Sequence, residues 1–378
     1  MKRLLFVISE DYVFVSHRLF LGKYALEQGM HVGILCNTSK HKKLIEESGI
    51  EVFDWPFIRG SLNPINEIKS LWFVFITIKK FKPDIVHSVA LKPIIYASIA
   101  CRCLFIKRRV FALTGVGFVF SSDKMKAKFL RPAVAAVLKW AFNGSLSRII
   151  VQNSDDRVLL ASKNIADPES VHLIRGAGVD TVAFKPSFID SNIPLVILPA
   201  RVLWDKGVGE FVSAARILYE KGLNARFAIV GEPDHHNPMC VPIAQIKLWV
   251  NEGTVEYWGH QYNMPKVLES ASIVCLPSYR EGLPKSLLEA ASCGLPLVAF
   301  DVPGCREAID NERNGYLVPL KDVNALSMAL EKLILNKDLR ETMGNNSRKK
   351  AIQEFSQERI AKETFEVWES LFTKAVLG

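Results

Sequence analysis

Short apolar segments rich in β-branched residues alternate with helical stretches along this chain of 378 residues. In the first half these segments are residues 4–9, 31–35, 85–88, 109–113 and 148–152, and in the second half they are 193–198, 227–230, 254–258, 273–276 and 297–300. Strands that alternate with helices are typical of parallel sheets covered by helices on both faces. The chain is also longer than a usual single core, so we expect an α/β protein with two doubly wound domains.

The best candidate for a linker is the segment 184–194, which has polar residues between Pro186 and Pro194. Apolar residues at helical spacing in the segment 357–371 predict a last helix. We therefore divide the chain into an N-terminal domain, a C-terminal domain and a C-terminal helical segment, at residues 1–187, 194–355 and 356–378.

One segment, residues 278–307, joins a loop, a helix and a buried strand. Pro284 stands where the first turn of a helix tolerates proline, and the residues after it are good helix formers with an apolar face. Gly294 can close that helix in a left-handed conformation before the apolar strand 297–300. The amides and the dipole at the beginning of such a helix attract an anion, typically a phosphate.

Two glutamates flank this expected anion site. Glu281 lies in the loop just before the helix, and Glu289 lies within it. Carboxylates beside a phosphate repel it unless they accept hydrogen bonds from hydroxyl groups elsewhere on the same ligand. A nucleotide sugar offers one set of hydroxyls on its sugar and another on its ribose. The alternative is that both glutamates are solvated surface residues, since glutamate is a common residue.

Two basic residues follow the strand-like segment 193–198. Arg201 and Lys206 lie in the loop that leaves this strand, and open α/β sheets bind ligands outside the carboxyl ends of their strands. Arginine can act as a fork and lysine as a point charge on one diphosphate. Alternatively, the two residues only add charge to the surface.

Together with these residues, several motifs give the chain a wider resemblance. The motifs are IRGAGVDTVAF at 174–184, EGLPKSLLEA at 281–290, SHRL at Ser16, HSVALKP at His87 and ALTGVGFVF at Ala112. With them the chain resembles, over nearly its whole length, the family 4 retaining glycosyltransferases of GT-B fold. Within that family it is similar to bacterial members that build surface polysaccharides on undecaprenyl diphosphate.

The resemblance implies a retaining enzyme that moves a sugar from a UDP-sugar, with a UDP-N-acetylhexosamine favoured. The acceptor it implies is a hydroxyl of a membrane-associated, undecaprenyl-diphosphate-linked saccharide. It also implies that the last helix crosses back to the first domain. Three alternatives remain open: a different donor sugar or a soluble acceptor, a nucleotide-sugar epimerase of GT-B architecture, and a non-enzymatic membrane-binding module.

The resemblance assigns roles in the second domain. Arg201 and Lys206 would stabilise the leaving diphosphate, and Glu281 would orient sugar hydroxyls, so these three residues are predicted to be catalytic. The other nucleotide-sugar contacts would be the backbone near Gly282 and Leu283, the ribose ligand Glu289, and a base-binding loop of Gly259, His260 and Gln261. The chain has no Asp-x-Asp motif and its seven cysteines form no paired zinc motif, so no metal or other cofactor is expected.

In the first domain, the possible donor or acceptor contacts are His17, His87, Thr114 and Gly115. His17 is predicted to open a helix capped by Ser16, and His87 is predicted to end a strand. Thr114 stands where some relatives have a histidine that contacts the sugar, so only the location is carried over. Either histidine of this chain is alternatively a structural residue.

Positive charge is concentrated in the first half. Residues 1–190 contain 27 Lys and Arg against 16 Asp and Glu, whereas residues 191–378 contain 21 against 23. Basic residues interspersed with large apolar ones can lie on an anionic membrane surface. The predicted membrane patch comprises Lys107, Arg108, Arg109, Lys124, Lys126, Lys128 and Arg131.

The alternative to that patch is a helix whose basic residues face only solvent. Nucleic acid is not an expected partner, because no nucleic-acid-binding motif is recognisable. The apolar stretch 71–78 is too short to span a bilayer. We therefore expect a cytoplasmic protein that is peripheral on the inner face of the cell membrane.

Overall fold

A computed structural model describes the chain except residues 59, 61–62, 116–124, 187–192, 236 and 374–378. The chain forms two compact units, residues 1–177 with 358–378 (unit 1) and residues 178–357 (unit 2). The central part of the predicted linker and Lys124 of the predicted membrane patch lie outside the described residues. The same holds for the side chains of Lys126 and Lys128.

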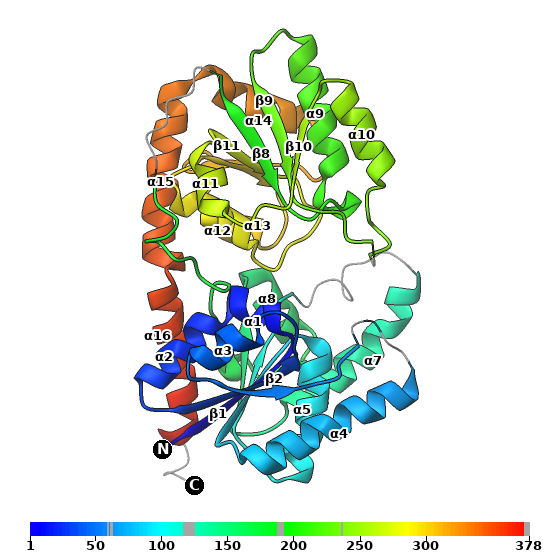
Figure 1. The fold of residues 1–378 in the computed structure, drawn as a ribbon, viewed down its shortest axis with the longest axis vertical. Helices are drawn as coiled ribbons and strands as arrows, with labels where there is room; N and C mark the ends of the chain where they lie inside the picture. The colour runs from blue at the N-terminus through cyan, green and yellow to red at the C-terminus, as the bar shows by residue number, and fades with distance from the viewer. Residues whose placement is uncertain (59, 61–62, 116–124, 187–192, 236, 374–378) are drawn as a thin grey trace. The chain divides into compact units, whose positions relative to one another are not determined.

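Unit 1 is built on a parallel sheet of seven strands in the order β3-β2-β1-β4-β5-β6-β7 (Figure 1). The strands are β1 Arg3–Glu10, β2 His31–Asn37, β3 Glu51–Asp54, β4 Ile85–Val89, β5 Arg109–Ala112, β6 Ser147–Val151 and β7 Val171–Leu173. Because successive side chains of a strand point to opposite faces, a strand that is buried on both faces is apolar along its whole length. This explains the continuous run of buried residues in β1.

Helices cover both faces of this sheet. One face, which includes Phe6 of β1, carries α1 Asp11–His17, α2 Leu19–Glu27, α3 Lys42–Glu47 and α16 Gln357–Thr373. The other face, which includes Leu5, carries α4 Pro64–Phe81, α5 Leu91–Cys103, α7 Met125–Phe142 and α8 Ser154–Ser162. The alternation of side chains along β1 thus divides the core of unit 1 into two layers.

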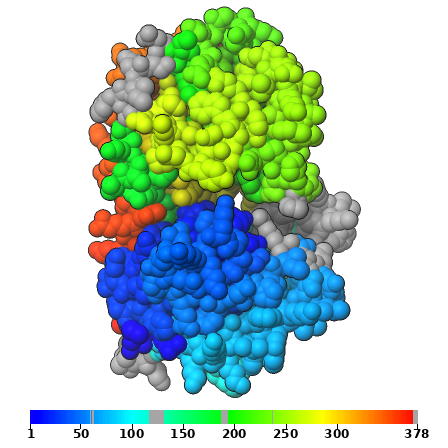
Figure 2. Space-filling view, in the orientation of Figure 1, coloured from blue at the N-terminus to red at the C-terminus, as the bar shows by residue number. Residues whose placement is uncertain are grey.

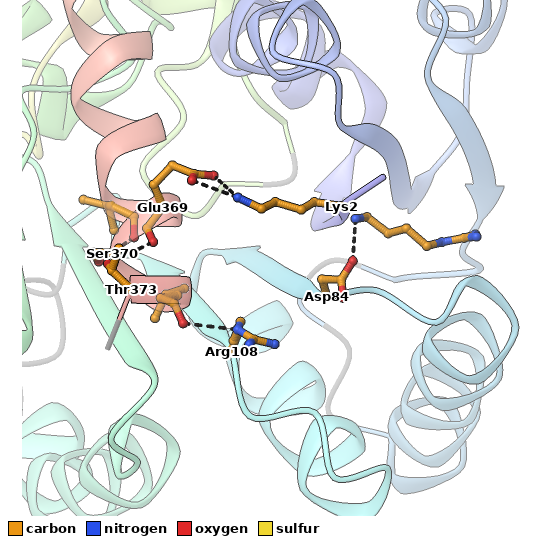
Figure 3. A network of polar contacts seen from close by, with 9 residues as sticks. Lys2, Asp84, Arg108, Glu369, Ser370 and Thr373 are labelled. Atoms are coloured by element: carbon orange, nitrogen blue, oxygen red, sulfur yellow. Dashed lines mark hydrogen bonds and ion pairs between the residues drawn. The ribbon is translucent and has the colours of Figure 1, made fainter. Parts of the chain in front are cut away.

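The last helix, α16, completes the core of unit 1. Trp368 is fully buried against Phe6, and its indole Nε1 donates to Nδ1 of His87 at 3.1 Å. Around this contact, Nζ of Lys2 donates to the carboxylate of Glu369 at 2.7 Å, as Figure 3 shows. The two ends of the chain are therefore tied together by packing and by charge.

Unit 2 is built on a parallel sheet of six strands in the order β10-β9-β8-β11-β12-β13. The strands are β8 Leu195–Pro199, β9 Arg226–Val230, β10 Glu256–Gly259, β11 Ile273–Leu276, β12 Leu297–Phe300 and β13 Gly315–Val318. The helices are α9 Val208–Glu220, α10 Ile243–Asn251, α11 Met264–Glu269, α12 Lys285–Ser292, α13 Cys305–Ala308, α14 Val323–Leu335 and α15 Lys337–Phe355. The predicted α/β fold with two doubly wound domains is confirmed.

Candidate functional site

The candidate site lies at the carboxyl ends of β8 and β11 in unit 2. These strands are neighbours in the sheet, but the chain leaves β8 toward β9 on one side and leaves β11 toward β12 on the other. Such a point, where the strand order reverses, is where open α/β sheets bind ligands. The loop after β8 carries Arg201 and Lys206, and the loop after β11 carries Glu281.

A glycine allows these two loops to touch. Gly207 follows Lys206 and has a left-handed backbone, with φ of 71°. A Cβ atom at this position would lie 1.9 Å from the carbonyl oxygen of Pro277, so no side chain fits. Beside it, the amide of Tyr279 donates to the carbonyl of Asp205 at 2.9 Å. The backbone itself therefore fixes the distance between the two functional loops.

Lys206 and Glu281 form an ion pair across this contact. The Lys206 Nζ atom lies 2.5 Å from Glu281 Oε1, and the two side chains are 19% and 12% exposed. Both are sheltered from water, which strengthens their attraction relative to a surface pair. The structure thus brings together a cation and a carboxylate that were predicted to be catalytic.

Helix α12 begins at Lys285, shortly after Glu281 in the chain. Pro284 is its N-cap residue, and no side chain caps its amino end. Because Glu281 stands just before this N-cap, the positive end of the helix dipole lies near the Lys206–Glu281 pair. The side chain of Leu283 is buried in the core, which leaves only its backbone and that of Gly282 for a ligand.

Glu289 lies in the second turn of α12 and is buried. Its carboxylate is 3.2 Å from Nζ of Lys285, one helical turn earlier. Burial raises the pKa of Glu289 above its ordinary value, and the charge of Lys285 only partly opposes this effect. A carboxylate that is held out of water in this way is suited to accept hydrogen bonds from a ligand hydroxyl.

Arg201 and Lys206 were predicted to contact one diphosphate, but in the structure they have different partners. The Nη1 atom of Arg201 donates to Oδ2 of Asp234, in the loop after β9, at 2.6 Å, and about half of the arginine side chain is exposed. An exposed pair of this kind is weak and can exchange partners when an anion arrives. Arg201 is therefore close to the same sheet edge but directed toward another loop.

The predicted base-binding residues lie at the end of β10, on the same edge. The carbonyl of Gly259 accepts from the amide of Gly231 at 2.9 Å, and Nε2 of Gln261 donates to the carbonyl of Trp258 at 2.6 Å. His260 is exposed, with its ring beside Tyr262. These contacts form an ordered loop that offers backbone groups to a planar ring.

Tyr279, in the same loop as Glu281, was not among the predicted site residues. Its hydroxyl donates to Oε1 of Glu210 in α9 at 2.5 Å, and Nζ of Lys321 lies 4.5 Å above its ring. Burial, together with the neighbouring Glu210 carboxylate, raises the pKa of Tyr279. Tyr279, Glu210 and Lys321 follow no common spacing in the sequence. The position of Tyr279, two residues before Glu281, could have indicated that it lies near the predicted site.

In unit 1, the structure corrects the helix boundary predicted at His17 and shows that His87 is buried. His17 ends α1 instead of opening a helix, and the hydroxyl of Ser16 donates back to the carbonyl of Tyr12 within that helix. His87 is only 1% exposed and packs against Phe6 and Trp368. It is a core residue and cannot contact a substrate in this conformation.

Thr114 and Gly115 follow β5 at the carboxyl edge of the unit 1 sheet and are exposed. The predicted membrane patch is also altered, because Arg109 is the first residue of β5 and is buried. Arg108, which is labelled in Figure 3, is half-buried, and its Nε atom donates to the carbonyl of Leu371 at 3.1 Å. Of the KRR run, only Lys107 is exposed.

Two parallel, doubly wound units place the chain in the class of two-domain α/β proteins whose ligands bind at the carboxyl ends of the strands. The chain is a glycosyltransferase of that class. Residues 180–350 match the family of glycosyl transferases group 1, and residues 3–153 match the glycosyl transferase 4-like family. The prediction of a family 4 glycosyltransferase with the GT-B fold is therefore confirmed.

Curated relatives agree with this family, and a solved structure agrees with the fold. The chain is 29% identical, over 85% of its length and 86% of the relative, to the N,N'-diacetylbacillosaminyl-diphospho-undecaprenol alpha-1,3-N-acetylgalactosaminyltransferase of Campylobacter jejuni. It is 27% identical, over 86% of its length and 85% of the relative, to the UDP-Gal:alpha-D-GlcNAc-diphosphoundecaprenol alpha-1,3-galactosyltransferase of Escherichia coli. Anabaena HepE, solved with UDP and glucose, has a TM-score of 0.78 at 18% identity, over 98% of this chain and all of that one.

In the described part of the chain, none of the helices is both long and apolar enough to cross a bilayer. Among the same residues, no group of three His, Cys, Asp or Glu side chains is placed to hold a metal ion.

Proposed function

We propose that this glycosyltransferase moves a sugar from a UDP-sugar, preferably a UDP-N-acetylhexosamine, to a hydroxyl of an undecaprenyl-diphosphate-linked saccharide, with retention of anomeric configuration. The observation that carries the donor half is the Lys206–Glu281 pair at the uncapped beginning of α12. The acceptor half is supported by the printed names of the Campylobacter jejuni and Escherichia coli enzymes, which both act on diphospho-undecaprenol-linked sugars.

In the proposed complex, the diphosphate lies at the amino end of α12, where the helix dipole and Lys206 offset its charge. Its arrival separates Lys206 from Glu281, so the carboxylate becomes available to a hydroxyl of the donor sugar. Arg201 exchanges Asp234 for a phosphate oxygen, and Glu289 accepts from the ribose. The free enzyme therefore holds its reactive groups in internal pairs that the substrate replaces.

The proposed reaction breaks the bond between the anomeric carbon and the diphosphate oxygen. The acceptor hydroxyl attacks from the same face, its oxygen forms the new glycosidic bond, and its proton passes to the departing diphosphate. Lys206 and the α12 amides stabilise the negative charge that develops on UDP as it leaves. We propose that no metal ion is needed, since these groups supply the positive charge at the leaving group.

We also propose that the enzyme works as a peripheral protein on the inner face of the cell membrane. Support comes from α4, which presents a stripe of apolar side chains that are 40% to 68% exposed, at Ile65, Ile68, Trp72, Phe73 and Ile76. Lys79 and Lys80 follow at the end of the same helix and are exposed. We call the exposed apolar residues the apolar stripe (residues 65–76), and the light-blue segment of the chain that includes α4 forms part of the surface seen in Figure 2. Aromatic and aliphatic side chains beside lysines suit an anionic bilayer surface.

The test is a transfer assay with purified enzyme. UDP-N-acetylhexosamines and UDP-hexoses would be offered with a short polyprenyl-diphosphate-linked saccharide, with and without a chelator. We expect one donor to be consumed, an α-linked product by NMR from the α-linked donor, and no effect of the chelator. A β-linked product would contradict retention, and sugar interconversion without acceptor would indicate an epimerase instead.

A further inference from the structure

The loop that carries Glu281 is tied to the chain on both sides of Lys206. The amide of Tyr279 donates to the carbonyl of Asp205, just before Lys206, at 2.9 Å. The hydroxyl of Tyr279 donates to Oε1 of Glu210, in the first turn of α9, at 2.5 Å. One tyrosine of the loop after β11 therefore contacts the segment around Lys206 with both its backbone and its side chain.

The ring of Tyr279 is held independently of its hydroxyl. It lies at 29° to the ring of Phe300 in β12, with the centroids 6.5 Å apart, and Nζ of Lys321 lies 4.5 Å from its centroid. Tyr279 and Glu210 are both half-buried, so water competes only partly for their hydrogen bond. Burial, and then the hydrogen bond to Glu210, raises the pKa of Tyr279, so the hydroxyl stays protonated and able to donate.

Two separated attachments fix the direction of a loop, whereas a single attachment fixes mainly its distance. The close approach of Gly207 to Pro277 sets the distance between the loops after β8 and β11. Glu210 lies in the helix that follows Gly207, so its bond to Tyr279 is a second, separate attachment. Glu281 comes two residues after Tyr279 in the same loop. The hydrogen bond between Tyr279 and Glu210 therefore limits rotation of the loop that presents Glu281.

This second attachment matters most when substrate is bound. In the free protein, Lys206 and Glu281 hold each other at 2.5 Å. In the proposed complex the diphosphate separates these two side chains, so the loops lose one of their contacts while Glu281 must stay in place for the donor sugar. The bond from Tyr279 to Glu210 uses no group that is proposed to touch the donor, so it persists in the complex.

We propose that Tyr279, through its hydrogen bond to Glu210, is a positioning residue that keeps Glu281 aligned for sugar transfer. The inference rests on the proposed roles of Lys206 and Glu281, and it adds to them a pair of residues that contacts neither donor nor acceptor. A shift of about 1 Å in a reacting group can slow a reaction about 100-fold, so loss of this hydrogen bond should act on kcat. Substrate binding should change little, because Tyr279 does not contact the substrate.

The first experiment measures kcat and KM for transfer from UDP-N-acetylhexosamine to a short polyprenyl-diphosphate-linked saccharide. Tyr279→Phe removes the hydroxyl and keeps the ring, and Glu210→Ala removes the acceptor. For each variant we expect kcat to be about tenfold lower and KM to stay within about twofold of the wild type. Glu210→Gln, which keeps an acceptor oxygen, should restore most of kcat. The double variant Tyr279→Phe with Glu210→Ala should lose no more than either single variant, because both changes remove the same bond.

Tyr316→Phe is the matched control. Tyr316 is also a half-buried tyrosine of unit 2, and Nζ of Lys332 lies 5.4 Å from the centroid of its ring. Its hydroxyl forms no hydrogen bond within the described part of the chain, so its removal should leave kcat and KM unchanged. Circular dichroism checks the fold of every variant, and Glu210→Ala gives the comparison if Tyr279→Phe does not fold.

The second experiment measures hydrogen–deuterium exchange of residues 278–283 with saturating UDP, and it needs no activity assay. We expect exchange to be about tenfold faster in Tyr279→Phe than in the wild type and in Tyr316→Phe. Equal exchange in the three proteins, or faster exchange with unchanged kcat, would overturn the proposal. If the wild type transfers no sugar, or Lys206→Ala keeps full activity, the proposed function fails instead, and the exchange rates still decide whether Tyr279 holds the loop.

Discussion

Lys206 Nζ and Glu281 Oε1 lie 2.5 Å apart, although 75 residues separate them in the sequence. Each follows a different strand, and the close approach of Gly207 to Pro277 holds the two loops in contact. In the free protein the pair holds the lysine near the beginning of α12, where the helix dipole is strongest. A cation that is already positioned when charge develops needs no reorganisation during the reaction.

Replacing Lys206 with alanine should therefore slow the chemical step. We expect kcat to fall by about 100-fold to 1000-fold, because a stabilising group at the developing charge is lost. KM should change much less, since the dipole of α12 still binds the diphosphate. Steady-state kinetics with Lys221→Ala as control, an exposed lysine paired with Glu331, checks the effect. A raised KM with unchanged kcat would instead show that Lys206 binds the substrate and the transition state equally.

Replacing Glu289 with glutamine should weaken the affinity for the nucleotide without lowering the free energy of unfolding at neutral pH. Because folding raises the pKa of Glu289, the folded state takes up its proton at higher pH than the unfolded chain. This group therefore lowers stability progressively as pH rises from the ordinary value of 4.5 through the raised one. In Glu289→Gln this decline of stability with rising pH should be absent, so the variant should be at least as stable as the wild type at neutral pH.

The same variant should bind UDP about tenfold more weakly, since a hydrogen bond from the ribose to a charged acceptor is replaced by a neutral one. Urea unfolding between pH 4 and 7 and calorimetric titration with UDP measure the two effects. Glu252→Gln, at an exposed residue paired with Arg216, should change neither quantity appreciably. Unaltered UDP affinity in Glu289→Gln would remove this residue from the ribose site.

The sequence predicted the α12 region well because its boundaries carry strong local signals. Pro284 and Gly294 mark the two ends, and the structure places α12 between them, with Gly294 at a φ of 74°. Three short strands were not predicted. β3 begins and ends with an acid, β7 has only three residues, and β13 begins with glycine, so none shows a clear apolar period.

The errors in unit 1 also arise where the local sequence signal is absent or misleading. Asp11 begins α1 directly after β1, so no loop residues mark the boundary, and Ser16 resembles a helix cap although it lies inside the helix. Arg109 reads as part of a basic surface run, but the strand begins at that residue and draws it into the core. Partners such as Asp234 for Arg201 depend on loop conformation, which local sequence patterns do not encode.

His87 should make unit 1 sensitive to acid. Burial, with a smaller contribution from the charge of Arg18, lowers the pKa of His87 to about 3, against an ordinary value of 6.5. Below pH 6.5 the unfolded chain takes up a proton that the folded protein excludes. Stability should then fall by about 1.4 kcal/mol per pH unit until the folded pKa is approached.

The variant His87→Phe tests this effect. It should be about 1 to 3 kcal/mol less stable at pH 7.5, because Nε1 of Trp368 loses its acceptor, but its stability should decline less steeply toward pH 5. Urea unfolding at both pH values measures the difference, and His235→Phe, at an exposed residue, serves as control. Parallel pH profiles for wild type and His87→Phe would contradict a neutral buried histidine.

The apolar stripe of α4 should control attachment to membranes. The double variant Ile68→Glu with Trp72→Glu removes two exposed apolar groups and adds two negative charges, which an anionic bilayer repels. We expect flotation with phosphatidylglycerol vesicles to be lost while turnover of a short, soluble acceptor analogue is retained, because the donor site in unit 2 is untouched. The matched control is Ile243→Glu with Leu248→Glu, which makes the same change at exposed apolar positions of α10. If both double variants float like the wild type, membrane contact must be made elsewhere on the protein. Retained flotation of the wild type at high salt would show that apolar insertion outweighs charge.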